Sequence, residues 1–277
     1  MTRLALLLLC SAKRNETCAG GVTLLHGFSK ERKNKMKDNN VKNVLSIDMD
    51  YIMAPCINMY NDCAGSEEFK NGDFWTQVNM IRNIDKYLEY DPSKLLAVVD
   101  VFTHAIKDVP KNKIMFAEEH DMILELLCRE DNIKETFNLY NMDHHHDIYY
   151  GPEQKSEIDR FDFACLANWV YYLGKNEKLH KYYWIKNGNS APFDESQISE
   201  LTFPFDNDKA FKDPAKLREI KFDYVFCCNS SEYFPAKFEY LFEMLIFIAE
   251  NMKNTTYTRW SKPYCIDGKS RPVPTEK

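Results

Sequence analysis

Short apolar runs alternate with stretches of helical spacing along most of the chain. The apolar runs predict strands over residues 41–49, 113–117, 136–142, 181–185 and 221–228. Helical spacing predicts helices over residues 74–90, 95–106, 122–128, 161–173 and 238–252. Asp91 and Pro92 are typical of a helix start, as an N-cap and a first helical residue. Because strands and helices alternate, the pattern predicts an α/β fold, a three-layer α-β-α arrangement with a mostly parallel central sheet.

The residues before this pattern form a separate segment. The apolar run over residues 4–9 imitates an export signal, but charged residues follow it in place of a cleavage context. It is also far shorter than the ~20 residues that span a bilayer. We therefore expect residues 1–35 to be an N-terminal extension or a misassigned start outside the fold, and residues 36–277 to form one domain. A short membrane or export signal is the alternative interpretation.

The composition is that of a globular protein with an acidic balance. Of the 277 residues, 44% are hydrophobic, which is enough for a substantial core. The 36 basic and 42 acidic residues give a formal net charge of −6, and no basic block lies within the predicted domain, so no nucleic-acid partner is expected. Nine cysteines without a C-x-x-C pattern fit reduced thiols, so we expect a cytoplasmic protein with no membrane partner. Its oligomeric state is not indicated.

Two acidic motifs follow apolar runs. In the segment 141–147, three histidines stand between two aspartates. In an extended backbone Asp143, His145 and Asp147 would line one side, while His144 and His146 would line the other. The segment 45–51 repeats this geometry, since it places Asp48 and Asp50 two residues apart after an apolar run. A D-x-D pattern by itself is also typical of a solvated turn, so the two motifs carry weight mainly together.

Four polar segments share one position relative to the predicted sheet. Residues 48–50, 118–120, 143–147 and 229–232 each follow the apolar part of a predicted strand. Open parallel sheets bind their ligands at the carboxyl ends of the strands, so these side chains are expected to converge. The first three segments bring four carboxylates and two imidazoles to that edge, from Asp48, Asp50, Asp143, Asp147, His120 and His145.

This set of side chains is suited to two metal ions. Four carboxylates close together would repel one another, and two divalent cations balance their charge. The oxygen-rich set, with two nitrogens and no thiolate, favours a hard ion such as Mn²⁺ over structural zinc. Two such ions can share one water and lower its pKa toward neutrality, which supplies hydroxide for a hydrolysis.

The same residues resemble the metal-binding signatures of the arginase, or ureohydrolase, superfamily. The resemblance lies in D-x-H-x-D (Asp143, His145, Asp147), in S-x-D-x-D (Ser46, Asp48, Asp50) and in the strand-end His120. The phrases 47–51, 118–120, 141–147 and 167–169 are similar to a divergent branch that includes the peptide arginases of ribosomal peptide natural-product maturation. This resemblance implies an arginase-like metallohydrolase domain with two Mn²⁺ per chain, which converts arginine side chains of a precursor peptide to ornithine and urea.

The resemblance also implies roles for individual residues. One ion would be held by His120, Asp143, Asp147 and Asp48, and the other by Asp143, His145, Asp48 and Asp50, with Asp143 and Asp48 bridging. The catalytic set would include Asp143 and His145. A carboxylate near the metals can pair bidentately with the substrate guanidinium, and Glu232 is either this partner or a surface acid that flanks a helix. The proton shuttle has no clear counterpart, and His144, His146 and Glu119 are the candidates.

Three departures from ordinary arginases bear on the substrate. The D-x-D motif precedes the other motifs instead of following them, which requires a permuted strand order. The further aspartate that ordinary arginases carry is absent from residues 51–55, and residues 116–119 replace a glycine-rich lead-in to the metal histidine. These losses affect recognition of the α-carboxylate and α-amine of free arginine, and an internal arginine of a peptide has neither group free.

Two other functions compete with this interpretation. A zinc-dependent, deacetylase-like amidohydrolase could hold one zinc with Asp143, His145 and Asp48, and would leave the other three ligands without a metal role. A non-catalytic binding module could keep a metal for stability alone. Trp169 is interpreted chiefly as a packing residue of its helix, and Tyr150 as either packing or a wall of the site.

Overall fold

The structure describes most of the chain from residue 40 to residue 261, with several gaps. The structure is a computed structural model that describes residues 40–54, 88–128, 132, 134–150, 155, 167–190, 193, 195–207, 209–230, 233–261, 265–266 and 269–270. The predicted extension over residues 1–35, most of the helix predicted over 74–90, the start of the helix predicted over 161–173, and Glu232 lie outside the described residues.

A seven-stranded parallel sheet forms the centre of the described domain. Its strands are β1 (Val41–Asp48), β2 (Ile114–Ala117), β3 (Thr136–Asp143), β4 (Leu179–Lys186), β5 (Phe205–Asn207), β6 (Tyr224–Cys228) and β7 (Arg259–Trp260). Their order is β5-β4-β3-β1-β6-β2-β7, and every pairing is parallel. A separate antiparallel pair joins β8 (Cys265–Ile266) to β9 (Lys269–Ser270). The five predicted strands are confirmed as β1, β2, β3, β4 and β6.

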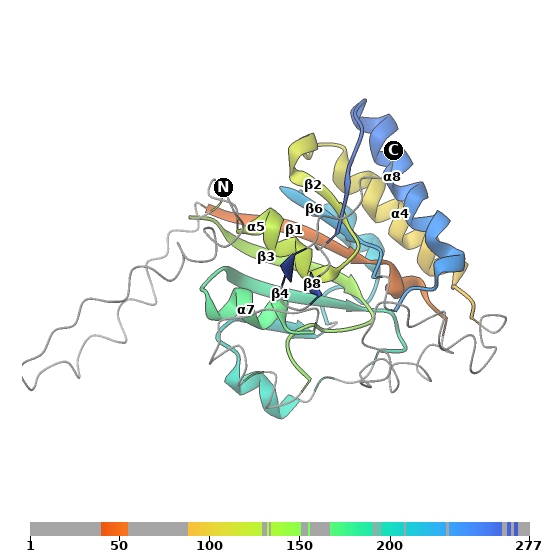
Figure 1. Cartoon of the computed structure of the whole chain (residues 1–277). Coiled ribbons are helices and arrows are strands. Elements are labelled where there is room, and N and C mark those ends of the chain that lie inside the picture. Colours follow the sequence, from red (N-terminus) through yellow and green to blue (C-terminus); the bar gives the residue numbers. More distant parts are fainter. Residues whose placement is uncertain are drawn as a thin grey trace, which may run out of the picture. The chain divides into compact units, whose positions relative to one another are not determined.

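Helices cover both faces of this sheet. The helices are α4 (Pro92–Ile106), α5 (Ile123–Leu127), α7 (Trp169–Lys175) and α8 (Glu239–Lys253), with 3-10 turns at η3 (Met49–Ile52), η7 (Lys111–Lys113), η8 (His120–Met122), η10 (Glu195–Glu200), η11 (Pro214–Glu219) and η12 (Ala236–Phe238). Buried residues of α4 and α8 belong to one apolar cluster, and those of α5 and α7 to another. Figure 1 shows α4 and α8 side by side on one side of the strands. The predicted three-layer α/β fold is therefore confirmed.

The start of α4 follows the sequence signal. Asp91 is the N-cap, and its side chain accepts a hydrogen bond from Ser93 N at 2.8 Å. Pro92 occupies the first turn, where its missing N–H costs nothing. The prediction for Tyr90 is wrong, because this residue forms a β-bridge with Met53 instead of ending a helix.

Alternation along the strands divides the core between the two faces. In β1, Leu45 and Ile47 pack with α4 and α8, whereas Val44 packs with α5 and α7. In β6, Cys227 belongs to the α4 and α8 cluster, and Cys228 belongs to the α5 and α7 cluster. Successive side chains of a strand point to opposite faces of the sheet. The positions of the buried apolar residues in a strand therefore fix the face to which its last residue points.

Three strands end with a polar residue on the face that α5 and α7 cover. In β1 Asp48 is in phase with Val44, and in β3 Asp143 is in phase with Leu139, which belongs to the same cluster as Val44. Cys228 is the last residue of β6 and lies on the same face. The apolar register of each strand therefore positions one potential ligand.

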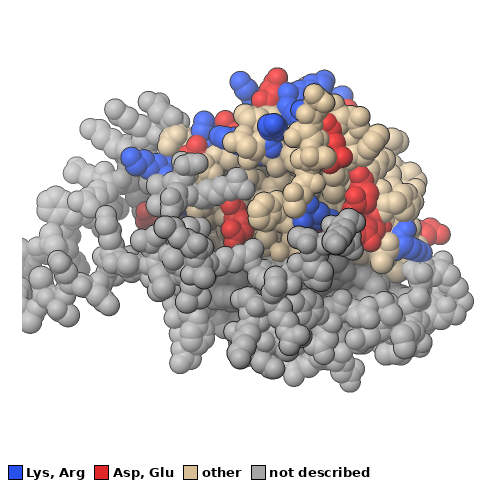
Figure 2. All heavy atoms as spheres, turned by 45° about the horizontal axis from the view of Figure 1, so that its top comes forward, with Lys and Arg blue, Asp and Glu red and all other residues tan. Residues whose placement is uncertain are grey.

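The surface supports no simple assignment of a partner. Figure 2 shows acidic and basic side chains interspersed over the described part of one face. In the part of the chain that the structure describes, no helix combines the length and apolar character needed to cross a bilayer.

Candidate metal centre

The four strands that carry the polar segments are consecutive neighbours. β3, β1, β6 and β2 follow one another in the sheet, and all of them run in the same direction. Their carboxyl ends therefore meet at one edge. The structure brings all six predicted ligands together at this edge: Asp48, Asp50, His120, Asp143, His145 and Asp147.

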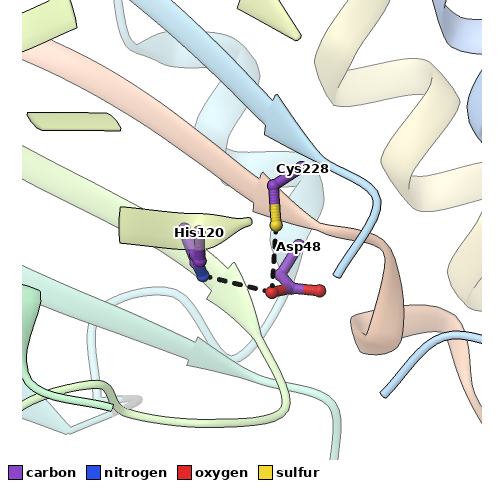
Figure 3. Close-up of side chains that lie close together, drawn as sticks. All are labelled: Asp48, His120 and Cys228. Atoms are coloured by element: carbon purple, nitrogen blue, oxygen red, sulfur yellow. Dashed lines mark hydrogen bonds and ion pairs between the residues drawn. The ribbon is translucent and has the colours of Figure 1, made fainter. Parts of the chain in front are cut away.

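His120 is surrounded by three carboxylates. Its Nδ1 lies 3.1 Å from Asp48 Oδ2, 3.2 Å from Asp143 Oδ2 and 3.0 Å from Asp147 Oδ2. All four side chains are buried. His120 comes from η8, directly after β2, and Figure 3 shows its ring directed at the carboxylate of Asp48. This group has the donors and the separation of a metal-binding site.

His145 forms a second group with Asp50 and Asp143. Its Nδ1 lies 2.8 Å from Asp50 Oδ2 and 4.0 Å from Asp143 Oδ1. Asp143 thus directs Oδ2 toward His120 and Oδ1 toward His145, and it belongs to both groups of potential ligands. A carboxylate in this position is able to bridge two ions.

The sequence predicted an extended backbone for the segments that carry these ligands, but in the structure this backbone is not extended. β3 ends at Asp143, and Asp147 has a left-handed φ of 49°. Likewise β1 ends at Asp48, and Asp50 lies in the 3-10 turn η3, with its N–H donating to Asp48 Oδ1 at 2.9 Å. The predicted geometry is therefore wrong beyond each strand end, although the same carboxylates converge. Turns draw the chain back over the sheet edge, where an extended chain would run away from it.

The two remaining histidines of the motif point away from the ligand groups. His144 Nδ1 lies 2.7 Å from the side-chain nitrogen of Asn187. His146 packs between Tyr150, Trp184 and Phe193. Burial lowers the pKa of His144 to about 4 and that of His146 to about 3, so both rings are neutral at pH 7. Neither residue belongs to the ligand groups that the described residues form.

Three hydrogen bonds fix the ligands from behind. Ser46 Oγ lies 2.7 Å from His120 Nε2, which leaves Nδ1 of the ring to face the carboxylates. Trp169 Nε1 donates to Asp147 Oδ2 at 2.7 Å, and Asn141 Nδ2 donates to Asp143 Oδ2 at 2.9 Å. Partners of this kind orient metal ligands and set their tautomers. Sequence reasoning treated Trp169 mainly as packing, and its side chain does both.

Replacing Ser46 by Ala should weaken metal binding without unfolding the chain. Loss of the hydroxyl frees the His120 ring to rotate and to change tautomer, and the loss of such a partner typically costs about 10–100-fold in metal affinity. Isothermal titration of the metal-free variant measures this. Ser93→Ala is the matched control, because Ser93 is exposed on α4 and its Oγ donates to the helix cap Asp91. Equal affinity loss in both variants would contradict the role of Ser46.

Cys228 is the residue of the centre that sequence reasoning missed. Its Sγ donates to Asp48 Oδ2 at 3.3 Å, and it forms a third ligand-type group with Asp48 and His120 (Figure 3). Burial, with Asp48 next to it, raises the pKa of the Cys228 thiol well above its usual value. The available signal was its place as the last residue of an apolar run, directly before the polar segment 229–232.

Burial and mutual repulsion govern the charges of the centre. Burial raises the pKa of Asp143 to about 7, with the charges of Asp147 and Asp48 adding to the effect. Burial and the charges of Asp48 and Asp143 raise the pKa of Asp50 well above its usual value. Burial alone would lower the pKa of His120, but the three carboxylates that surround its Nδ1 hold this pKa well above its usual range. Without a bound cation, the negative charges of the carboxylates are thus not fully balanced by positive charge nearby.

The stability of the metal-free protein should fall as the pH rises from 6 to 8. Asp143 has a folded pKa above its unfolded one, so its stabilising contribution is complete below about pH 4 and is lost through about pH 7. His120 has the same sign, since its raised pKa contributes stability below its unfolded pKa and loses it at higher pH. Each ~1 kcal/mol lost lowers the Tm by about 2–4 °C.

Metal should reverse this trend. Ligands bind metal deprotonated, so the rise in Tm on adding divalent metal should be larger at pH 8 than at pH 6. Scanning calorimetry with and without the metal measures both effects. A metal-free Tm that rises between pH 6 and 8, or a metal effect independent of pH, would contradict the assignment of these carboxyls as ligands.

A small cleft opens over the centre. It has a volume of about 30 Å³ and is lined by Asp48, His120, His145, Asp147, Tyr150, Ala167, Ser230 and Tyr233. The ring of Tyr233 lies 4.5 Å from that of His145, and Tyr150 is 47% exposed. Tyr150 therefore forms part of the wall, whereas Tyr149 is buried against Tyr171. Glu232 itself is not described, but Ser230 and Tyr233 on either side of it line the cleft.

Glu118 is occupied by other contacts. It pairs with Arg259 of β7 and accepts a hydrogen bond from Asn229 at 3.2 Å. Arg259 also donates to Glu239 and Glu243 of α8. This acidic residue of the strand-end segment 118–120 therefore ties the sheet edge to α8.

The chemistry of the donor set fits a cation. Asp50 Oδ2 and His120 Nδ1 are buried atoms that make no hydrogen bond of acceptable geometry within the described residues. Both atoms nevertheless lie within ion-pair distance of another ligand. Asp50 Oδ2 is 2.8 Å from His145 Nδ1, and His120 Nδ1 is 3.0 Å from Asp147 Oδ2. Buried polar atoms are costly unless they are paired, and a metal ion among them would satisfy both. Buried Asp and His side chains of this protein can thus hold a metal ion.

The comparisons with known proteins add no assignment. Searches with models of protein families, among curated proteins and among solved structures found no match to this chain.

Proposed function

We propose that this protein is a binuclear manganese hydrolase that converts arginine side chains of a peptide to ornithine and releases urea. The observation that carries the proposal is the position of Asp143, whose two oxygens face two separate groups of buried Asp and His ligands. Such a pair of groups is suited to two ions that share one carboxylate. The resemblance of the motifs to the arginase superfamily supplies the reaction.

The ligand atoms divide naturally between two ions. His120, Asp147 and Asp48 accompany Asp143 on one side, and His145 and Asp50 accompany it on the other. Oxygen donors predominate in both groups, which favours Mn²⁺. When bound, the two ions would lower the pKa of a shared water and so supply hydroxide near neutral pH.

The residues of the cleft are suited to a planar cation. Asp48 and Asp147 line the cleft together with the rings of Tyr150 and Tyr233. A guanidinium pairs with carboxylates and stacks on aromatic faces. Glu232, which lies outside the described residues, remains our candidate for a bidentate partner of the substrate, because the sequence places this carboxylate shortly after β6.

The chain's own residues also limit where protons can be held. His144 is buried, neutral at pH 7 and in contact with Asn187, so it acts most simply by supporting the loop that carries His145.

The two alternative functions, a zinc amidohydrolase and a binding module, account for fewer of the buried ligands and for less of the cleft. A single zinc held by Asp143, His145 and Asp48 would leave His120, Asp50 and Asp147 buried without a role, at a considerable desolvation cost. A binding module with a stabilising metal would not require a cleft that exposes ligands to solvent. Both alternatives predict a different metal content or no turnover.

The decisive experiment combines metal analysis with turnover. The metal-free protein is loaded with Mn²⁺, its metal content is measured, and arginine-containing peptides are incubated with it and analysed by mass spectrometry for ornithine and by assay for urea. Two manganese ions per chain with ornithine formation support the proposal. One zinc with deacylation supports the amidohydrolase, and metal retention without turnover of any peptide supports the binding module.

A further inference from the structure

A sulfur atom lies within the proposed metal centre. Cys228 Sγ is 3.3 Å from Asp48 Oδ2, and this same oxygen is 3.1 Å from His120 Nδ1. Figure 3 shows the three side chains directed at one another from β6, β1 and the segment after β2. The group therefore offers one sulfur, one oxygen and one nitrogen to a single point.

The position of Cys228 is fixed by the fold. It is fully buried, it ends β6, and its register places it on the face covered by α5 and α7, with Asp48 and Asp143. The neighbouring Cys227 is equally buried but points to the opposite face, among residues of α4 and α8. Only one of the two adjacent thiols therefore reaches the centre.

A second observation indicates that this point binds a ligand. His120 Nδ1 is buried, faces the group and makes no hydrogen bond of acceptable geometry within the described residues. Nitrogen, oxygen and sulfur donors together match a borderline or thiophilic ion such as Zn²⁺ or Co²⁺, whereas the group of Asp50, Asp143 and His145 offers no sulfur.

We propose that Cys228 makes the two metal positions chemically different, so that the position at Asp48 and His120, which also accepts Mn²⁺, binds a thiophilic divalent ion more tightly through sulfur. The other position keeps its preference for a hard ion. On binding, a metal–sulfur bond forms and the S–H bond breaks, and the thiol proton leaves to solvent as H⁺ with no change of oxidation state. The hydrogen bond from Cys228 to Asp48 is then replaced by a bond to the ion.

This inference rests on the proposed binuclear centre but can fail separately from it. Turnover of arginine peptides tests the reaction, whereas metal spectroscopy tests the ligand, and neither measurement depends on the other. A chain that binds cobalt through sulfur without acting on any peptide would retain this inference and lose the proposed reaction. The converse result would do the opposite.

The test uses Co²⁺ as the probe. The full-length, metal-free chain and its Cys228→Ser and Cys227→Ser variants are titrated with Co²⁺, and the near-ultraviolet absorption is recorded. A thiolate-to-cobalt charge-transfer band should appear in the unsubstituted chain and in Cys227→Ser, and it should be absent from Cys228→Ser. Zinc affinity of Cys228→Ser should fall by ~10-fold or more while manganese affinity changes little, since the removed donor is soft.

Two outcomes would overturn the inference. No charge-transfer band in the unsubstituted chain would mean that sulfur is not a ligand and that Cys228 only donates to Asp48. A band that persists in Cys228→Ser would assign the sulfur to another cysteine. If Cys228→Ser fails to fold, cadmium-113 NMR of the unsubstituted chain decides. Coupling between cadmium and cysteine β-protons that survives in Cys227→Ser supports the inference, and its absence contradicts it.

Discussion

Asp143→Ala should abolish metal binding and turnover together. Asp143 contributes to both groups of ligands, and among the described residues it is the carboxylate within 4.0 Å of both His120 and His145, so its loss removes one donor from each proposed metal position. Loss of a supporting partner alone costs about 10–100-fold in metal affinity, so loss of this ligand should cost on the order of 100-fold or more. Titration calorimetry and measured metal content give the affinity, and urea release gives the activity.

His144→Ala is the matched control for this experiment. His144 follows Asp143 directly and is also buried, but its ring contacts Asn187 and points away from the ligand groups. We expect this variant to retain both ions at nearly unchanged affinity, with lower stability because a buried side chain is removed. Similar metal loss from both variants would contradict the geometry, and a large loss of turnover with metals retained would establish His144 as a catalytic residue.

The metal-free Asp143→Asn variant separates charge from structure. The four carboxylates repel one another in the absence of metal, and burial with this repulsion raises the pKa of Asp143 to about 7. A neutral amide of the same shape removes that penalty. The metal-free variant should therefore be as stable as the unsubstituted chain at pH 8 or more stable, while it binds metal poorly, which shows that affinity loss is not unfolding.

An internal arginine of a peptide should be hydrolysed far better than free arginine. Free arginine brings an α-carboxylate, and no Lys or Arg lines the cleft among the described residues to pair with it. Glu118, which follows β2 directly, is engaged by Arg259 and Asn229. Charged groups that enter a site without partners are costly, so we expect a difference in kcat/KM on the order of 100-fold or more.

The comparison needs three substrates under one condition. Free arginine, arginine blocked at both α-groups, and an arginine-containing peptide are assayed for urea with the Mn²⁺-loaded protein. Blocked arginine should be turned over better than free arginine, and the peptide better than both. Equal kcat/KM for free arginine and for the peptide would remove the peptide preference and leave a general guanidino hydrolase.

The strands and the metal ligands could be predicted from the sequence because both depend on the local pattern of apolar and polar residues. Apolar runs such as those of β1 and β3 are short, are bounded by polar residues and place an acidic residue directly at their ends. A parallel sheet collects strand ends at one edge, so convergence of Asp48, Asp143 and His120 followed from the fold class. The start of helix α4 was equally predictable, because Asp91 and Pro92 form a typical N-cap and first helical residue.

Contacts between distant segments were decided only by the tertiary structure. The turn at Asp147 takes a left-handed φ because packing holds it there, with Trp169 bonded to its carboxylate, and no local pattern marks this. The short strands β5 and β7 have three and two residues, too few to show alternation.

The clearest division lies at Cys227 and Cys228. The sequence determined that two adjacent thiols end an apolar strand, and hence that they point to opposite faces. It did not determine which face holds the metal ligands, because this depends on the register of β6 against β1, where Cys228 stands beside Asp48. Register depends on how the apolar side chains of strands far apart in the chain are buried together, and only the folded sheet fixes it.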